Sequence, residues 1–261
     1  MRQDDRAPFE RALRRARVSA YAAGEFVGQE GFTTAGEIRD LAVRSGIGRG
    51  TAVLDLCCGV AGPGRLLTRE LGCAYLGVDA SASAVALARA ADPSCRFTVG
   101  QVPPLPAGSF DVVLLLETML AFEDKDALVR EVAAALRPGG RFAFTLEEGV
   151  PLSTAERAAM PDADTVWLTP LEDLAASLER AGLSLSWQED RSRAHRAVAE
   201  ALAGAFADDA PGIEAHIGRR ALDDLLAAHR LWIRWLDEGR VRKLAAVAAL
   251  AEGQPLLPRD G

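Results

Sequence analysis

The sequence predicts an α/β fold built on a doubly wound, mostly parallel sheet of seven strands. Between residues 52 and 187, apolar runs of strand length alternate with segments of helical periodicity. Such alternation requires a parallel sheet with helices on both faces. The first apolar run leads into a glycine-rich turn at 57–64, and the second ends in an acid, Asp79. Ligands in this architecture bind beyond the carboxyl ends of the strands, where both features lie.

The first strand, its turn and the following helix are the unit around which the chain is organised. Residues 52–56 surround Asp55 with apolar side chains, as in a strand buried on both faces. Glycines in the turn let the backbone approach a ligand, and the helix expected over 65–71 offers free N–H groups at its start. The second strand, 74–78, is followed by Asp79, where this fold places an acid against ribose hydroxyls. Together these features predict a nucleoside-binding half-sheet.

The next elements continue the alternation. Ser81 can cap a helix over 82–91, which precedes a third strand at 96–99. A proline-rich loop, 100–109, leads to a fourth strand at 110–116. A helix over 124–137 then stops at Pro138-Gly139-Gly140, before a fifth strand at 141–146.

A capping-box pattern introduces the last βα unit. Thr169-Pro170-Leu171-Glu172 combines a capping residue, a proline at the first helical position and an acid. The helix that it begins is expected to end at Gly182, and the alternating residues 183–187 predict a sixth strand. The final apolar run, Leu244–Leu250, fits strand or helix by periodicity, and we favour a last strand at the sheet edge.

Two regions outside the alternation are predicted to cover the binding edge. Residues 7–46 are helical on either side of Tyr21–Glu37, a stretch of interleaved glycines and aromatics that forms either a mobile cover or an irregular connection. Residues 194–207 and 213–236 form a helical insertion. The expected organisation is an N-terminal helical cover (1–45), a ligand-binding domain (46–190), a helical lid (191–240) and a last strand with its tail (241–261).

Composition narrows the classes of function. The chain has 261 residues, 49% of them hydrophobic, enough for one full core and an appended subdomain. Its net charge of −7 argues against a general nucleic-acid or membrane-surface binder. We find no apolar run near the ~18 residues of a membrane helix and no secretory signal, so a cytoplasmic protein is expected. The oligomeric state stays open, with a homodimer as one option.

The four cysteines, Cys57, Cys58, Cys73 and Cys95, show neither a CxxC motif nor Cys/His ligand spacing, so no metal site is predicted. Cys57 and Cys58 are adjacent within the glycine-rich turn. The simpler interpretation is that they are small residues filling a tight turn in a reducing compartment. A redox or nucleophilic role for either stays open.

Four motifs in order resemble the class I S-adenosylmethionine-dependent methyltransferases that act on small molecules: VLDLCCGVAG, LGVDAS, FTVGQVPPLPAGSFDVVLLLET and ALRPGGRF. The likeness covers roughly residues 46–187. The run at 21–32 is also similar to the N-terminal cover of sarcosine- and glycine-type enzymes. The resemblance implies a Rossmann-like domain, S-adenosylmethionine as the cofactor and a small-molecule acceptor.

The resemblance also assigns roles by position. The methionine end of the cofactor would lie against Asp55, Cys57, Gly59 and Ala61. Its adenosine would contact Asp79 through the ribose and Ala80, Gln101 and Val102 through the adenine. Its sulfonium and amine would face Glu117 and Thr118, and Gln29 would approach from the cover. Because Cys57 and Ala61 replace the first and third glycines of the usual D-x-G-x-G-x-G pattern, a positive φ at either would be strained.

Acids at the strand ends suit a cationic cofactor, and three residues are candidates for catalysis. Asp55, Glu117, Glu147 and Glu148 would form an acidic crevice that favours a sulfonium. Methyl transfer needs in-line positioning, and a base only where the acceptor starts protonated. The candidates are Glu117, Glu147 and His195, for which ordinary roles as solvated strand-end acids or a packing histidine also stay open.

Two other functions are compatible with parts of this pattern. A protein of this fold can bind the cofactor yet catalyse a non-methylating reaction, or only bind, and no fixed acceptor motif excludes this. A nicotinamide-dependent oxidoreductase would need a full GxGxxG motif and a catalytic Tyr/Lys pair, which this chain lacks.

Overall fold

A seven-stranded sheet organises the molecule, in the order β3-β2-β1-β4-β5-β7-β6. The structure, a computed structural model, describes residues 6–251, and side chains from residue 11 onward. β7 runs antiparallel to both neighbours, and the remaining pairs are parallel. This confirms the predicted mostly parallel α/β sheet. The strands are β1 (Ala52–Leu56), β2 (Ala74–Asp79), β3 (Arg96–Val99), β4 (Phe110–Leu115), β5 (Leu136–Glu148), β6 (Leu183–Asp190) and β7 (Arg242–Leu250).

Helices cover both faces of the sheet, each through its own apolar core. One core joins the sheet to α5 (Lys125–Ala135) and α7 (Leu171–Arg180). The other joins it to α2 (Ala35–Ser45), α3 (Gly62–Leu71) and α4 (Ala82–Ala91). Because α2 packs directly on the sheet, the N-terminal region contributes to the sheet's core as well as to the cover.

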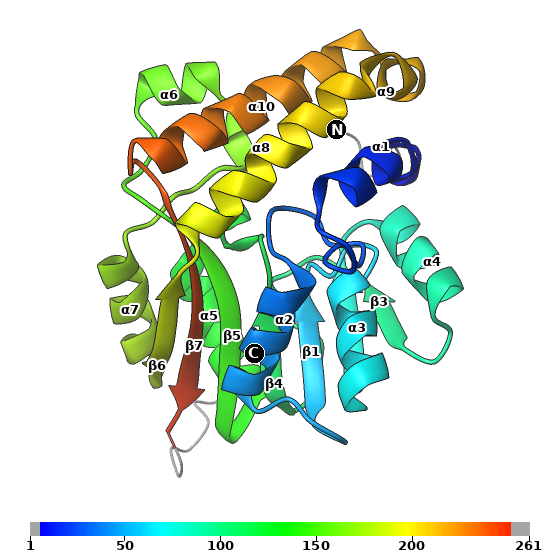
Figure 1. The fold of residues 1–261 in the computed structure, drawn as a ribbon. Helices are drawn as coiled ribbons and strands as arrows, with labels where there is room; N and C mark the ends of the chain where they lie inside the picture. Colours follow the sequence, from blue (N-terminus) through cyan, green and yellow to red (C-terminus); the bar gives the residue numbers. More distant parts are fainter. Residues whose placement is uncertain (1–5, 252–261) are drawn as a thin grey trace.

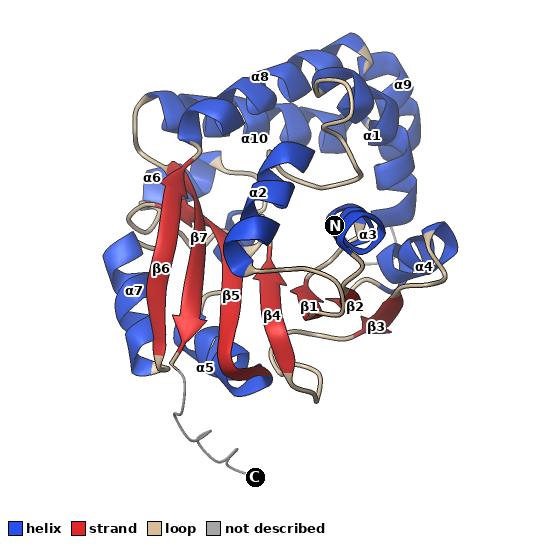
Figure 2. Ribbon diagram, turned by 60° about the horizontal axis from the view of Figure 1, so that its bottom comes forward, coloured by secondary structure: helices blue, strands red, loops and turns tan. Residues whose placement is uncertain are grey.

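A layer of four helices lies across the carboxyl ends of the strands (Figures 1 and 2). These are α1 (Arg6–Ala20), α8 (Ser192–Asp208), α9 (Ala210–Ile217) and α10 (Arg219–Asp237). Leu13 of α1 shares an apolar cluster with Phe206 of α8 and Leu222 of α10. The N-terminal helix and the insertion before β7, far apart in the sequence, therefore form one cap. Three short elements, η2 (Met119–Ala121), α6 (Thr154–Ala159) and η3 (Ala163–Thr165), complete the described chain.

The position predicted for the last strand is wrong. β7 is inserted between β5 and β6, and β6 occupies the edge. The sequence explains the exchange, since Leu244–Val247 is buried on both faces, as suits an inner strand. In β6, by contrast, only Leu183 is buried, and the following residues alternate between exposed and half-buried. The second residue of β7, Lys243, is charged and nevertheless buried.

Several predicted boundaries also change. The helix expected over 213–236 is divided at Gly218, whose φ of +83° ends α9, and α9 already begins at Ala210, between the two predicted helices. The capping box at Thr169 is wrong: α7 follows Pro170 without a side-chain cap, and Leu171 N instead donates to Glu148 Oε1 at 3.4 Å. β5 begins at Leu136, so it includes the residues expected to end the preceding helix and form a turn.

No helix among residues 6–251 combines the length and apolar character needed to cross a membrane.

Two helical glycines allow a matched test of packing. A Cβ on Gly64 in α3 would overlap the Tyr75 ring, whereas a Cβ on the exposed Gly204 in α8 would meet no atom within 4 Å. Gly64→Ala should lower the free energy of unfolding by about 1–3 kcal/mol through overpacking. Gly204→Ala should raise it by about 1 kcal/mol through helix propensity. Urea denaturation of both variants measures the contrast, and equal effects would contradict the packing around Tyr75.

Candidate active site

The turn between β1 and α3 forms the floor of the site through an alternating left-handed backbone. Cys57, Gly59 and Ala61 have φ values of +56°, +54° and +56°. The strain expected if Cys57 or Ala61 adopted positive φ is therefore present at both residues. The turn is tied to β2, because Cys58 N donates to Val78 O at 3.0 Å and Gly59 N donates to Asp79 Oδ2 at 2.9 Å.

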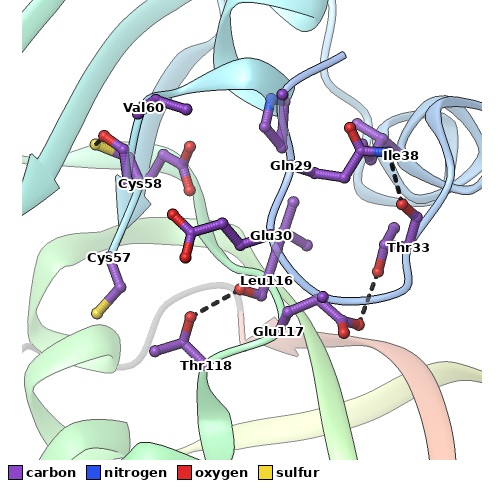
Figure 3. A pocket seen from close by; sticks show the side chains of 15 residues that line it. Gln29, Glu30, Thr33, Ile38, Cys57, Cys58, Val60, Leu116, Glu117 and Thr118 are labelled. Carbon is purple, nitrogen blue, oxygen red and sulfur yellow. Dashed lines mark hydrogen bonds between the residues drawn. The ribbon is translucent and has the colours of Figure 1, made fainter. Parts of the chain in front are cut away.

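A cavity of about 310 Å³ lies between this turn, the end of β4 and the N-terminal segment (Figure 3). None of its fifteen lining residues is a lysine, arginine or histidine. Three are acids, Glu30, Asp55 and Glu117, and Figure 3 shows Glu30 extending from the cover toward Cys57 and Cys58. The charge of this lining favours a cationic ligand.

Asp55 lies at the bottom of the cavity with a strongly shifted pKa. Its side chain is buried, and its Oδ2 accepts a hydrogen bond from Tyr75 Oη at 2.6 Å. Burial raises the pKa of Asp55 to about 7, with a further contribution from the nearby Asp79 charge, although the Tyr75 hydrogen bond opposes the shift. A cation near Asp55 would favour its ionised form.

The sequence of the sheet matches a known domain. The family model described as "Methyltransferase domain" matches residues 53–140, from β1 into β5. Methyltransferase GfsG of Streptomyces halstedii is 30% identical over 178 residues, which cover 62% of this chain and 63% of that protein. Residues 53–140 are therefore similar to a methyltransferase domain. The chain spans less than two thirds of the length of this curated relative.

Solved structures with this fold include methyltransferases and a cyclase. Phosphoethanolamine N-methyltransferase 2 of Haemonchus contortus, in complex with phosphomonomethylethanolamine and S-adenosylhomocysteine, has a TM-score of 0.75 at 18% identity, covering 94% of this chain and 60% of that chain. The [4+2]-cyclase SpnF has a TM-score of 0.73 at 21% identity, covering 93% of each chain. At these identities the likeness shows the fold.

Six of the residues assigned to the cofactor line the cavity above the β1–α3 turn: Gln29, Asp55, Cys57, Gly59, Glu117 and Thr118. Asp79 and Ala61 lie buried behind the turn. Ala80, Gln101 and Val102 lie outside the lining; Gln101 is exposed, and Val102 packs against the core on the α5 face. Their contacts with a cofactor stay predictions.

The two adjacent cysteines differ in setting. Cys57 is half-buried and lines the cavity, whereas Cys58 is buried, and burial raises the pKa of its thiol. A raised pKa disfavours the nucleophilic thiolate at Cys58.

The Gln29 side chain stabilises the N-terminal segment through hydrogen bonds to its backbone. Its Nε2 donates to Glu25 O and Thr33 O at 2.8 and 2.9 Å, and its Oε1 accepts from Val27 N at 2.7 Å. Tyr21 Oη adds a bond to Gly31 O at 2.8 Å. The segment is therefore an ordered loop with its own hydrogen bonds rather than a loose connection.

Glu117, just after β4, binds this loop. Its Oε2 accepts from Phe32 N at 3.0 Å, and its Oε1 accepts from Thr33 Oγ1 at 2.7 Å. The loop approaches closely at Gly31, where φ is +93° and a Cβ would overlap the Glu117 side chain. Glu117 itself has a φ of +56°, which directs its carboxylate at the loop.

Lys243 of β7 neutralises Glu117 and is the main site residue that sequence reasoning missed. Its Nζ lies 2.7 Å from Glu117 Oε2 and 2.5 Å from Glu147 Oε1, and 5.2 Å from the centre of the Phe32 ring. Burial alone would lower the pKa of Lys243, but the two carboxylates raise it above its ordinary value. The available signal was a lysine placed directly before an apolar strand.

The same charges decide the protonation of Glu117. Burial would raise its pKa, but Lys243, His195 and the bonds from Lys243 and the cover hold the pKa of Glu117 at about 2. A carboxylate with so low a pKa is a weak base at neutral pH. The geometry supports a structural role for Glu117 more directly than the predicted role in proton transfer.

His195 and Glu147 are brought to this cluster but not to the cavity. His195 Nε2 lies 3.1 Å from Glu37 Oε2, and its Nδ1 lies 3.8 Å from Glu117 Oε1, beyond hydrogen-bond reach. Glu147 turns to Lys243, and Glu148 pairs with Arg242 at 2.9 Å. The expectation that Glu147 and Glu148 face the crevice is therefore wrong, because buried or neighbouring cations hold both. Direct catalytic roles for His195 and Glu147 stay predictions.

Two buried lysines provide a test of the Glu117 cluster. Lys243→Met would leave two carboxylates buried without their cation, and we expect a loss of about 3–5 kcal/mol in the free energy of unfolding. Within residues 11–251, Lys125, also buried, donates only to Phe122 O and Trp167 O, both at 2.7 Å. Lys125→Met should therefore cost about 1–3 kcal/mol. Chemical denaturation compares the two, and a smaller loss for Lys243→Met would contradict the central role of this ion cluster.

Proposed function

We propose that this protein is an S-adenosylmethionine-dependent methyltransferase that acts on a small-molecule acceptor. The observation that carries the proposal is the acid-walled cavity over the left-handed turn, with Asp79 at the end of the adjoining strand. The relatives' names support the reaction class, and the H. contortus enzyme is named for phosphoethanolamine, a small acceptor.

The described residues fit this cofactor in charge and in backbone shape. The sulfonium and ammonium groups of the cofactor are cationic, and the acids of the lining suit them. Gly59 exposes bare backbone to the cavity, where a Cβ would lie 3.1 Å from Glu30 Oε1. Each Asp79 oxygen accepts one backbone N–H, from Gly59 and Ser81, which leaves lone pairs for hydroxyl donors. Asp79 would therefore hold the ribose and the turn the methionine end.

The roles proposed for the chain itself are binding, orientation and exclusion of water. When bound, the cofactor supplies an electrophilic methyl group on a cationic sulfur. Asp55 and Glu30 would stabilise that positive charge from below and from the cover. Glu117, held by Lys243, would keep the 21–34 loop closed over the site, and a dry, ordered site favours in-line transfer.

The deciding experiment is turnover. The purified protein would be incubated with S-adenosylmethionine and a panel of small N-, O-, C- and S-nucleophiles, and S-adenosylhomocysteine would be quantified with the methylated product. Formation of both supports the proposal. Calorimetric binding of the cofactor without turnover across the panel would favour a non-methylating or binding-only protein of this fold, and absence of binding would contradict the proposal altogether.

Removing the charge of Asp79 should weaken cofactor binding selectively. Asp79→Asn retains the shape but loses the acceptor strength at one oxygen, so affinity for S-adenosylhomocysteine should fall by about 1–3 kcal/mol. Asp111→Asn is the matched control, because Asp111 also bonds a strand backbone, Ala52 N at 2.7 Å, but lies at the opposite end of the sheet. Isothermal titration calorimetry compares the two variants, and equal loss in both would contradict the ribose assignment.

Cofactor binding should depend on pH through Asp55. With a pKa of about 7 in the empty protein, Asp55 is partly protonated at neutral pH, and a bound cation lowers that pKa. Binding below about pH 7 therefore releases a proton, and affinity for S-adenosylmethionine should rise with pH by up to about tenfold per unit until it levels off above about pH 7. Asp55→Asn should flatten the dependence. Calorimetry in buffers of different ionisation enthalpy counts the protons, and uptake of protons would contradict this prediction.

A further inference from the structure

A second hollow, of about 140 Å³, lies between α1, α3 and α4 beside the proposed cofactor cavity. Figure 1 places α1 across the ends of these two helices, at the β3 side of the molecule. The hollow is separated from the first cavity by Gly28 and Val60, which line both. Nothing in the proposed methyl transfer uses it.

Four arginines surround this hollow: Arg11, Arg14, Arg17 and Arg65. Arg11 and Arg14 are exposed and one turn apart on α1, and no carboxylate of residues 11–251 is hydrogen-bonded or ion-paired with either. Arg15, the residue after Arg14, is instead bound to Asp209. Asp92, which lies in reach of the Arg65 charge, does not line the hollow. So dense a positive charge stands out on a chain with a net charge of −7.

The rest of the lining is apolar. Phe26 of the cover and Leu87 and Ala91 of α4 complete the wall with Val60. Arg65 is fixed at the base of the hollow by a bond from its Nε to Ala61 O at 3.3 Å. A ligand that suits this lining has an anionic group for the guanidinium groups and a short carbon portion for the apolar wall.

We infer that this hollow binds the phosphate group of a small organic phosphate. Guanidinium groups pair with the several oxygens of a phosphate through two parallel N–H bonds, and several arginines together suit a dianion better than a single carboxylate. The limited volume and the overall negative charge disfavour a nucleic acid. The inference stands on these residues alone and does not depend on methyl transfer.

Binding of simple phosphates tests the inference directly. Butyl phosphate, inorganic phosphate and malonate would each be titrated into the protein by calorimetry at low ionic strength. We expect one saturable site, with butyl phosphate bound at least about threefold more tightly than inorganic phosphate because of the apolar wall, and malonate bound more weakly than either. Equal affinity for malonate and inorganic phosphate, or no advantage for butyl phosphate, would overturn the assignment to an organic phosphate.

A double variant locates the site. Arg14→Gln combined with Arg65→Gln should weaken butyl phosphate binding at least about tenfold. The control, Arg69→Gln, alters an exposed arginine one turn further along α3 that does not line the hollow, and it should change affinity less than about twofold. An equal loss in the control would indicate general electrostatics, and binding only to vesicles that contain an anionic lipid would indicate a membrane surface; either result overturns the inference. Calorimetry with S-adenosylhomocysteine on the same samples tests the proposed function separately, so failure of phosphate binding can be distinguished from failure of cofactor binding.

Discussion

The closed form of the site depends on one buried cation. Lys243 lies between Glu117 and Glu147, and all three side chains are almost fully removed from solvent. Burying two carboxylates is costly, and their attraction to one ammonium offsets that cost only when the geometry is maintained. Because Glu117 also accepts the Phe32 and Thr33 bonds, the position of the N-terminal loop is linked to a strand more than two hundred residues later.

This link explains why the cap and the sheet form one unit. His195 in the first turn of α8 bonds Glu37 in the first turn of α2, so the insertion is attached to the N-terminal helices at the same point where β7 reaches the sheet. Burial opposes ionisation of Glu37, yet its bond to His195 and its place in a capping box hold its pKa below the ordinary value. Several ion-paired and hydrogen-bonded groups therefore share one enclosed layer above the strands.

The chemistry of the cavity follows from the side chains and backbone that remain accessible beneath this enclosed layer. Lys243 is paired with Glu117 and does not itself line the cavity, so the cavity lining contains acids and exposed backbone. Burial raises the pKa of Asp55 to about 7, and its hydrogen-bond partner, the Tyr75 hydroxyl, opposes the shift without cancelling it. A cationic cofactor would therefore be attracted to the acids of this cavity. The arginine-lined hollow on the other side of Gly28 and Val60 has the opposite charge.

The sequence by itself determined the local features: the order of strands and helices, the glycine-rich turn, and the acid that ends β2. Apolar periodicity and turn chemistry act between neighbours in the chain, so they can be read without a structure. Only the tertiary structure decided that β7 is an inner strand, that Lys243 neutralises Glu117, and that Glu147 and His195 lie outside the cavity. Those outcomes depend on which distant segments come into contact and which charged groups are buried together, and neither can be predicted from a local sequence pattern.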